Sequence, residues 1–126
     1  MRKLSVLLVD DNPTFLKAAR DVVAALPNIA GIACANSGPE ALAHFSRSNA
    51  DLVLTDIMMP EMSGFELIRK LRARDAPPRI FAVTLHESYE YSAAVRRSGA
   101  DGCISKREFG ASIPKLLASL CCTANA

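Results

Sequence analysis

Short apolar runs alternate along the chain with longer segments in which apolar residues recur at helical spacing. The short runs predict strands over 4–9, 29–35, 51–56, 79–85 and 102–105. The longer segments predict helices over 13–26, 38–48, 64–74 and 87–98. Five strand–helix units in succession indicate a parallel sheet covered by helices on both faces. Right-handed crossovers then favour a single flavodoxin-like domain, a doubly wound α/β sandwich with strand order 2-1-3-4-5.

The last apolar segment permits two different helices. Apolar residues between 109 and 120 have helical spacing, but Gly110 and Pro114 interrupt it. Either the helix begins near Ser112, whose hydroxyl would cap it, or a longer helix is kinked at Pro114. The sequence leaves both alternatives open.

The composition is that of an ordinary globular domain. The chain has 126 residues, 50% of them hydrophobic, and a formal net charge of +2 at pH 7. This length is enough for one core, and the small charge argues against a surface that binds nucleic acid. The apolar run over 4–9 is too short for a signal peptide, and no stretch approaches the length of a membrane span. We therefore expect a cytoplasmic protein.

Polar residues stand where several of the predicted strands end. Asp10 and Asp11 follow the first strand in the stretch LLVDDNP, and Asp56 ends the third. Thr84 ends the fourth strand, and Lys106 follows the fifth. The carboxyl ends of a parallel sheet lie at one edge, where ligands bind beside the switch point between the first and third strands. We therefore expect these five residues to converge, although they come from distant parts of the sequence.

Three carboxylates in one place need water or a cation to offset their repulsion. Because no histidine or cysteine stands beside them at ligand spacing, a hard cation is favoured, and Mg²⁺ is the best candidate. Lys106 and Thr84 could then hold phosphoryl oxygens, and Asp56 could act as a nucleophile that forms an aspartyl phosphate. The alternative for the adjacent pair is helix capping by Asp11 or Asn12. The two roles are compatible.

Four stretches of the chain resemble the receiver domain of bacterial two-component response regulators. They read VDDNP, LVLTDIMMPEMSGFELIRKLR, AVTLHE and GADGCISK, and they stand in the order and at the distances typical of that family. The resemblance covers essentially the whole chain. It implies that Asp56 accepts a phosphoryl group from the phosphohistidine of a histidine kinase, so that the chain works as a phosphoacceptor switch in a two-component or phosphorelay pathway.

The resemblance also implies roles for the other site residues. The Mg²⁺ site would be built from Asp10, Asp11, Asp56 and the backbone carbonyl of Met58. Among these, Asp11, Asp56 and the carbonyl would be the direct ligands. Thr84 would bond a phosphoryl oxygen and shift when Asp56 is modified, and Lys106 would pair with the phosphoryl group.

The chain departs from the family pattern at a few positions near the site. Cys103 stands three residues before Lys106, where receivers commonly have tyrosine or phenylalanine, so the usual rotating aromatic side chain is absent there. Arg107 replaces the proline that often follows the lysine. Leu85 is bulkier than the common alanine after the threonine, and His86 follows it. This combination is most similar to receivers of the LuxR/NarL type.

Receivers of the LuxR/NarL type usually carry a helix-turn-helix output domain. We assign residues 1–122 to the receiver domain and 123–126 to a short C-terminal tail, with no output domain after it. A stand-alone receiver and a receiver separated from its output domain both stay open.

Two tyrosines lie in the predicted fourth helix. Tyr89 and Tyr91 cannot share one face, because residues two apart on a helix do not. We expect one of them to be buried and the other exposed, where an aromatic side chain would suit a partner surface.

We predict that phosphorylation acts on the surface formed by the fourth helix, the fifth strand and the fifth helix. With Cys103 in place of the usual aromatic residue, we expect the backbone and the fourth helix to be repositioned, more than an aromatic side chain to rotate. The implied partners are a sensor histidine kinase or phosphotransfer protein and, downstream, a partner protein or a lost DNA-binding output domain. A phosphorylation-dependent homodimer is a further open alternative.

No enzyme activity is expected beyond the chain's own phosphorylation and dephosphorylation, since a haloacid-dehalogenase-type phosphatase needs a second acid where Met58 stands. The competing function is a phosphorylation-independent interaction module with the same fold.

Overall fold

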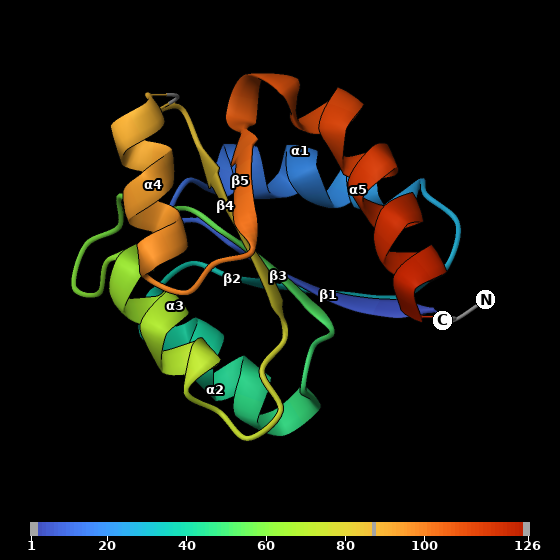
Figure 1. Cartoon of the computed structure of the whole chain (residues 1–126). Coiled ribbons are helices and arrows are strands. Elements are labelled where there is room, and N and C mark those ends of the chain that lie inside the picture. The colour runs from blue at the N-terminus through green and yellow to red at the C-terminus, as the bar shows by residue number, and fades with distance from the viewer. Residues whose placement is uncertain (1–2, 87, 125–126) are drawn as a thin grey trace.

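Parallel strands form one sheet, with helices on both of its faces (Figure 1). The computed structural model describes residues 3–86 and 88–124. The strands are β1 (Leu4–Val9), β2 (Ile29–Ala35), β3 (Leu52–Thr55), β4 (Arg79–Thr84) and β5 (Gly102–Ser105). The helices are α1 (Pro13–Ala24), α2 (Gly38–Ser48), α3 (Gly64–Arg72), α4 (Tyr89–Arg97) and α5 (Phe109–Ala124), and a 3₁₀ turn, η1 (Lys106–Glu108), precedes α5. The sheet order β2-β1-β3-β4-β5 confirms the predicted doubly wound topology.

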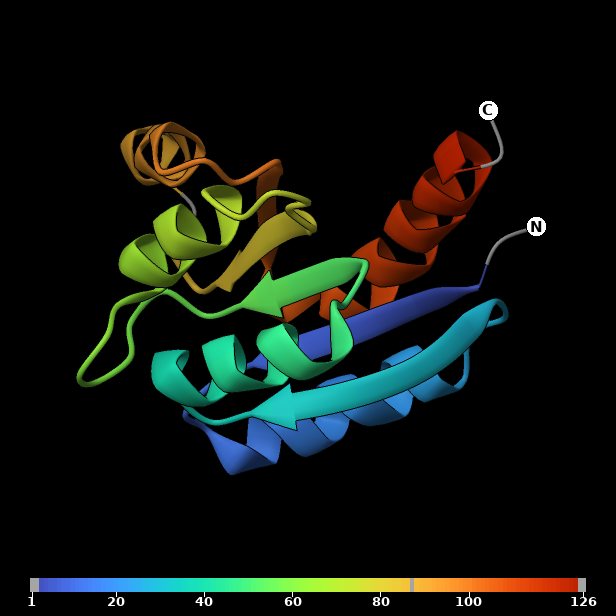
Figure 2. The same ribbon diagram turned by 90° about the horizontal axis from the view of Figure 1, so that it is seen from below.

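The alternation of side chains along the strands divides the core into two parts. Leu7 and Val9 of β1 pack into the cluster that is shared with α2, α3 and α4. Val6 and Leu8 pack into the cluster that is shared with α1 and α5. Figures 1 and 2 show the helices divided between the two faces in the same way. Because both faces of β1 are covered, its sequence is a nearly continuous apolar run, which is typical of a central parallel strand.

Side-chain caps determine where the helices begin. Serine side chains accept hydrogen bonds from backbone N–H groups in the first turns of α2, α3 and α4. For α1 the cap is Asn12, whose side-chain oxygen accepts from the N–H groups of Thr14 and Phe15. Of the two caps predicted for this helix, Asn12 is therefore correct and Asp11 is wrong. Since Asn12 caps α1, the acid pair Asp10 and Asp11 is not needed for capping and can interact with other groups.

The last helix is the longer of the two predicted alternatives. It begins at Phe109 and runs through Pro114, so a start near Ser112 is wrong. A proline inside a helix costs about 3 kcal/mol. Ile113 and Leu117 are buried on either side of it, and each buried side chain of this size contributes about 1.5–3 kcal/mol, so packing outweighs the proline. Neither α5 nor any other helix in the described part of the chain is long and apolar enough to cross a membrane.

Asp101 ties the end of α3 to the start of β4. Its carboxylate accepts hydrogen bonds from the Ile80 N–H at 2.7 Å and from the Arg72 guanidinium at 3.1 Å. The Arg79 guanidinium lies 3.7 Å from the same oxygen. Arg72 also donates its Nε–H to the Gly99 carbonyl at 2.7 Å. These contacts fix the loop that follows α4.

Replacing Asp101 with alanine is expected to lower the free energy of unfolding by about 2 kcal/mol, because the Ile80 N–H and the Arg72 guanidinium lose their acceptor. Urea denaturation measures the loss. Asp75→Ala removes an exposed acid from the loop before β4 and is the matched control, expected to stay within about 0.5 kcal/mol of the wild type. Equal losses in the two variants would contradict the structural role of Asp101.

Candidate functional site

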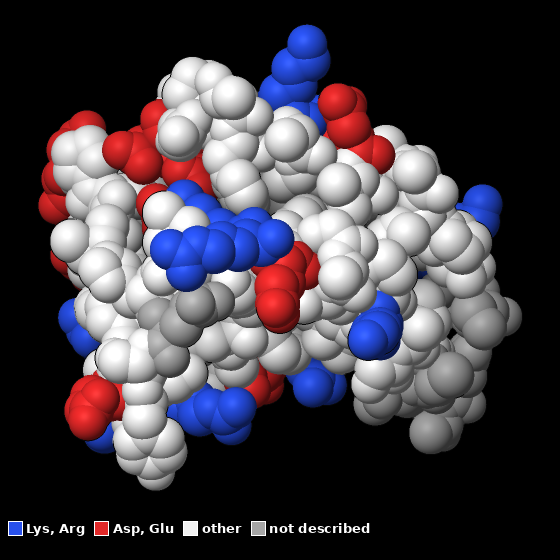
Figure 3. Space-filling view, turned by 90° about the horizontal axis from the view of Figure 1, so that it is seen from above, with Lys and Arg blue, Asp and Glu red and all other residues white. Residues whose placement is uncertain are grey.

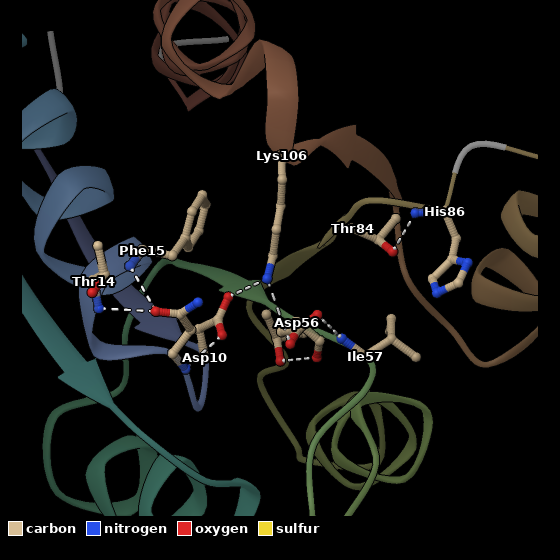
Figure 4. Close-up of polar contacts among 10 residues, drawn as sticks. Asp10, Thr14, Phe15, Asp56, Ile57, Thr84, His86 and Lys106 are labelled. Carbon is tan, nitrogen blue, oxygen red and sulfur yellow. Dashed lines mark hydrogen bonds and ion pairs between the residues drawn. The ribbon is translucent and has the colours of Figure 1, made fainter.

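The acids predicted at the strand ends meet at one edge of the sheet (Figure 4). β1 and β3 are neighbours, and Val9 lies beside Thr55 in their register. The residues that follow, Asp10 and Asp56, therefore enter the same space. Asp10 is 1% exposed and Asp56 is 7% exposed, whereas Asp11 is open to solvent. The site is thus buried at its base and accessible from one side.

The three acids could hold a metal ion. Each offers one carboxylate oxygen, and these oxygens lie within 4.8 Å of one another. Oxygen donors of this charge, with one acid open to solvent, suit a hard divalent cation such as Mg²⁺. Met58 lies on the loop after β3, and its side chain is 64% exposed. Only its backbone carbonyl was predicted as a ligand, so the exposed side chain does not conflict with that role.

Lys106 places its ammonium group close to two of the acids. Its Nζ lies 2.7 Å from Asp10 Oδ2 and 3.6 Å from Asp56 Oδ2, and it lies 4.8 Å from the centroid of the Phe15 ring. Phe15 in turn packs edge-on against Phe109 at the start of α5, with ring centroids 5.6 Å apart. The aromatic support of the lysine was missed from the sequence. The only signal for it is that Phe15 lies in the first turn of the helix after the acids.

The Asp56 carboxylate is held in an environment that disfavours its charge. Burial raises the pKa of Asp56 above its ordinary value, and the neighbouring charge of Asp10 raises it further. Lys106 acts in the opposite direction, as does the Ile57 N–H, which donates to Asp56 Oδ1 at 2.8 Å. A cation bound among the acids would offset the negative charge of Asp56. The raised pKa of Asp56 and the cluster of carboxylate oxygens therefore both favour a bound cation.

Thr84 lies on the side of Lys106 opposite to Asp10 (Figure 4). Its side chain is at the end of β4 and is 3% exposed. Its hydroxyl oxygen accepts a hydrogen bond from the His86 N–H at 3.0 Å. The hydroxyl proton is then still available for donation to an acceptor in the site. The structure thus brings Asp10, Asp11, Asp56, Thr84 and Lys106 to one edge, as the sequence predicted.

The surface around this edge is mixed in charge and partly apolar. Figure 3 looks onto the side of the β4–α4 turn and shows acidic and basic groups interspersed among uncharged ones. Large exposed apolar side chains in the described part of the chain lie after β3, after β4 and at the start of α4: Met58, Leu85 and Tyr89. An apolar rim of this kind suits contact with another protein.

The site thus consists of acids, a lysine and a hydroxyl at the switch point of a doubly wound parallel sheet. The family model of the response regulator receiver domain matches residues 6–118, and the chain belongs to this family. The resemblance stated from the sequence is therefore confirmed. Receiver domains are signalling modules of two-component systems.

Relatives with known names match most of the chain. It is 33% identical over 104 residues to the nitrate/nitrite response regulator protein NarL of Escherichia coli strain K12, a match that covers 81% of this chain and 47% of NarL. It is 38% identical over 104 residues to the sensory transduction protein RegX3 of Mycolicibacterium smegmatis, over 81% of this chain and 43% of that protein. The chain thus spans less than half the length of these curated relatives.

Solved structures share the fold. A two-component response regulator of the LuxR family from an Aurantimonas species superposes with a TM-score of 0.86 at 25% identity, over 94% of this chain and 84% of that one. This similarity agrees with the LuxR/NarL type expected from the sequence.

Proposed function

We propose that this chain is a phosphoacceptor switch of a two-component or phosphorelay pathway, in which Asp56 accepts a phosphoryl group from a histidine kinase or a phosphotransfer protein. The observation that carries the proposal is the position of Lys106. Its ammonium lies 3.6 Å from the Asp56 carboxylate, at the edge where the three acids cluster. Membership of the receiver family supports the same function.

The proposed reaction forms one bond and breaks one. A carboxylate oxygen of Asp56 bonds to phosphorus while the phosphorus–nitrogen bond of the donor's phosphohistidine breaks. The imidazole leaves with the electron pair and takes up a proton. The Ile57 N–H holds Oδ1 of Asp56 at 2.8 Å, so Oδ2 is the oxygen left to attack. Transfer of this kind depends mainly on positioning and charge neutralisation.

Lys106 changes its partner in this scheme. It now pairs with Asp10 at 2.7 Å, and a phosphoryl group on Asp56 would bring anionic oxygens towards the same ammonium. Thr84 would donate its hydroxyl proton to another phosphoryl oxygen. The remaining positive charge would come from Mg²⁺, held by Asp10, Asp11, Asp56 and the backbone carbonyl of Met58.

The signal would leave through the surface formed by α4, β5 and α5. The receiver domain would comprise residues 1–122, with 123–126 as a short tail. A separate partner, a DNA-binding output domain or a second copy bound on phosphorylation would read the changed surface. Catalysis would be limited to the gain and loss of the chain's own phosphoryl group. Similarity to a LuxR-family response regulator supports this type of output.

Intact mass after incubation with acetyl phosphate and Mg²⁺ tests the proposed function. The expected result is a gain in mass of one phosphoryl group. When EDTA removes the metal, no phosphoryl group should be added, because the three acids then repel the anionic donor. Some receivers are not phosphorylated by small-molecule donors such as acetyl phosphate. A beryllofluoride titration followed by NMR therefore serves as a second test. Absence of both responses would contradict the proposal and favour the phosphorylation-independent interaction module.

A further inference from the structure

Tyr91 of α4 connects three segments that surround the site. Its ring stacks on the ring of His86, with centroids 4.8 Å apart and an interplanar angle of 29°. It also contacts Phe65 of α3, with centroids 5.9 Å apart. Tyr89, two residues earlier, is 85% exposed. Of the two tyrosines, of which one was expected to be buried and the other exposed, Tyr89 is exposed and Tyr91 is partly buried against the core.

The Tyr91 hydroxyl is buried and has no hydrogen-bond partner among the described residues. A buried hydroxyl without a partner is unfavourable by about 1–3 kcal/mol, so this arrangement favours any change that supplies one. Burial raises the pKa of Tyr91, the nearby Thr84 hydroxyl lowers it, and the Asp56 charge raises it. His86 connects Tyr91 to the site, because its N–H donates to the Thr84 hydroxyl and its ring stacks on the Tyr91 ring.

Cys103 of β5 lies in the same region of the core as Tyr91. It is close enough to raise the pKa of the phenol. Position 103 holds a cysteine where receivers commonly have an aromatic residue, so the usual aromatic side chain on β5 is absent. In the structure an aromatic ring does stand near Thr84, but α4 supplies it rather than β5.

Thr84 can link the phosphoryl group to this ring. Its hydroxyl oxygen accepts the His86 N–H and has a second lone pair, while its proton is free to turn. When that proton is donated to a phosphoryl oxygen, the second lone pair is left for the Tyr91 hydroxyl. The chain of contacts then runs from Asp56 through Thr84 and Tyr91 into α4.

We propose that Tyr91 is a positioning residue through which phosphorylation of Asp56 moves α4: the Tyr91 hydroxyl donates to Thr84 in the phosphorylated state and draws the helix with it. This inference rests on the proposed function, because it needs a phosphoryl group on Asp56. In this proposal the aromatic side chain that responds to phosphorylation belongs to α4 rather than to β5.

The tyrosine content of the chain provides a direct test. The protein has two tyrosines and no tryptophan, so Tyr89→Phe leaves Tyr91 as the sole tyrosine reporter, and Tyr91→Phe leaves Tyr89. With Mg²⁺ and beryllofluoride, we expect the tyrosine emission of Tyr89→Phe to change, because the buried phenol gains an acceptor. We expect the emission of Tyr91→Phe to stay constant.

A second measurement separates positioning from packing. Tyr91→Phe keeps the ring and removes only the hydroxyl. It is expected to bind beryllofluoride as the wild type does, by fluorine NMR, while the chemical-shift changes of the α4 amides fall to roughly half or less. Tyr89→Phe is the matched control and should retain the full changes.

The outcomes distinguish the two proposals. If beryllofluoride does not bind the wild type in the presence of Mg²⁺ and acetyl phosphate adds no phosphoryl group to it, the proposed function is wrong, and the inference about Tyr91 is wrong as well. If it binds, but the emission of Tyr91 is unchanged or Tyr91→Phe retains the full α4 response, the function stands and the role of Tyr91 is overturned.

Discussion

Replacing Asp56 with asparagine is expected to abolish phosphoryl uptake and, at neutral pH, to raise the free energy of unfolding. The amide has nearly the shape of the carboxylate but lacks the anionic oxygen that attacks phosphorus. Its neutral side chain also avoids the burial cost and the repulsion from Asp10 that the Asp56 charge experiences. Loss of function with a gain of stability is the signature of a residue retained for its chemistry.

The stability gain depends on pH in a defined direction. The pKa of Asp56 is raised in the folded chain above its ordinary value of 3.8, so the folded state binds its proton more strongly than the unfolded state does. The Asp56 contribution to wild-type stability therefore falls as the pH rises from 3.8 through the folded pKa. The advantage of Asp56→Asn should be largest at neutral pH and shrink as the pH is lowered towards 3.8.

Intact mass with acetyl phosphate and urea denaturation in EDTA at several pH values measure these two effects. Asp21→Asn, an exposed acid on α1, is the matched control and should leave both unchanged. Adding Mg²⁺ should stabilise the wild type more than Asp56→Asn, because the variant lacks one of the three acids. A phosphorylated Asp56→Asn, or a variant less stable than the wild type at neutral pH, would contradict the account of this residue.

Gly64→Ala is expected to lower the free energy of unfolding by about 3 kcal/mol and to slow phosphoryl uptake. A Cβ at Gly64 would lie 2.6 Å from the Ile57 Cα and closer still to the Asp56 carbonyl oxygen. Both neighbours are backbone atoms, so no side chain can rotate to make room. The Gly64 N–H also donates to the Ile57 carbonyl at 2.8 Å. The displaced segment is the one whose N–H holds Asp56.

Gly110→Ala is the matched control for this prediction. A Cβ at Gly110 meets nothing within 4 Å, and the residue lies in α5, where alanine is favoured over glycine by about 0.5–1 kcal/mol. Urea denaturation should therefore place the two variants on opposite sides of the wild type, and the rate of phosphoryl uptake should fall only in Gly64→Ala. Similar stabilities or similar rates would show that the contact with the Asp56 loop is unimportant.

The sheet and the acidic cluster could be predicted because both follow from local patterns and one rule of topology. Apolar runs identify the strands, and parallel strands bring their ends to one edge, so Asp10 and Asp56 had to meet once β1 and β3 were neighbours. Several element ends still differ from the predicted ones by one or two residues, since the last turns depend on individual hydrogen bonds.

Other features depended on contacts that no local pattern encodes. Whether Asp11 or Asn12 caps α1 is decided by which side chain can turn back to the helix, and the two are adjacent in the sequence. The passage of α5 through Pro114 reflects burial against α1 and the sheet rather than helix propensity. The stacking of Tyr91 on His86 joins a helix to a loop, and it could be found only from their placement in space.

The contacts of Arg72 with Gly99 and Asp101 restrict how α4 can move when the site is phosphorylated. The carbonyl of Gly99, just after α4, is bound by Arg72, and Gly99 has a φ of +114° that other residues rarely adopt. If phosphorylation moves α4 as we propose, this end of the helix would stay in place. The opposite end carries the exposed Tyr89, so a small rotation about Gly99 gives its largest displacement there. A partner bound to Tyr89 would therefore be displaced further than a partner bound near Gly99, because Tyr89 lies at the far end of the helix.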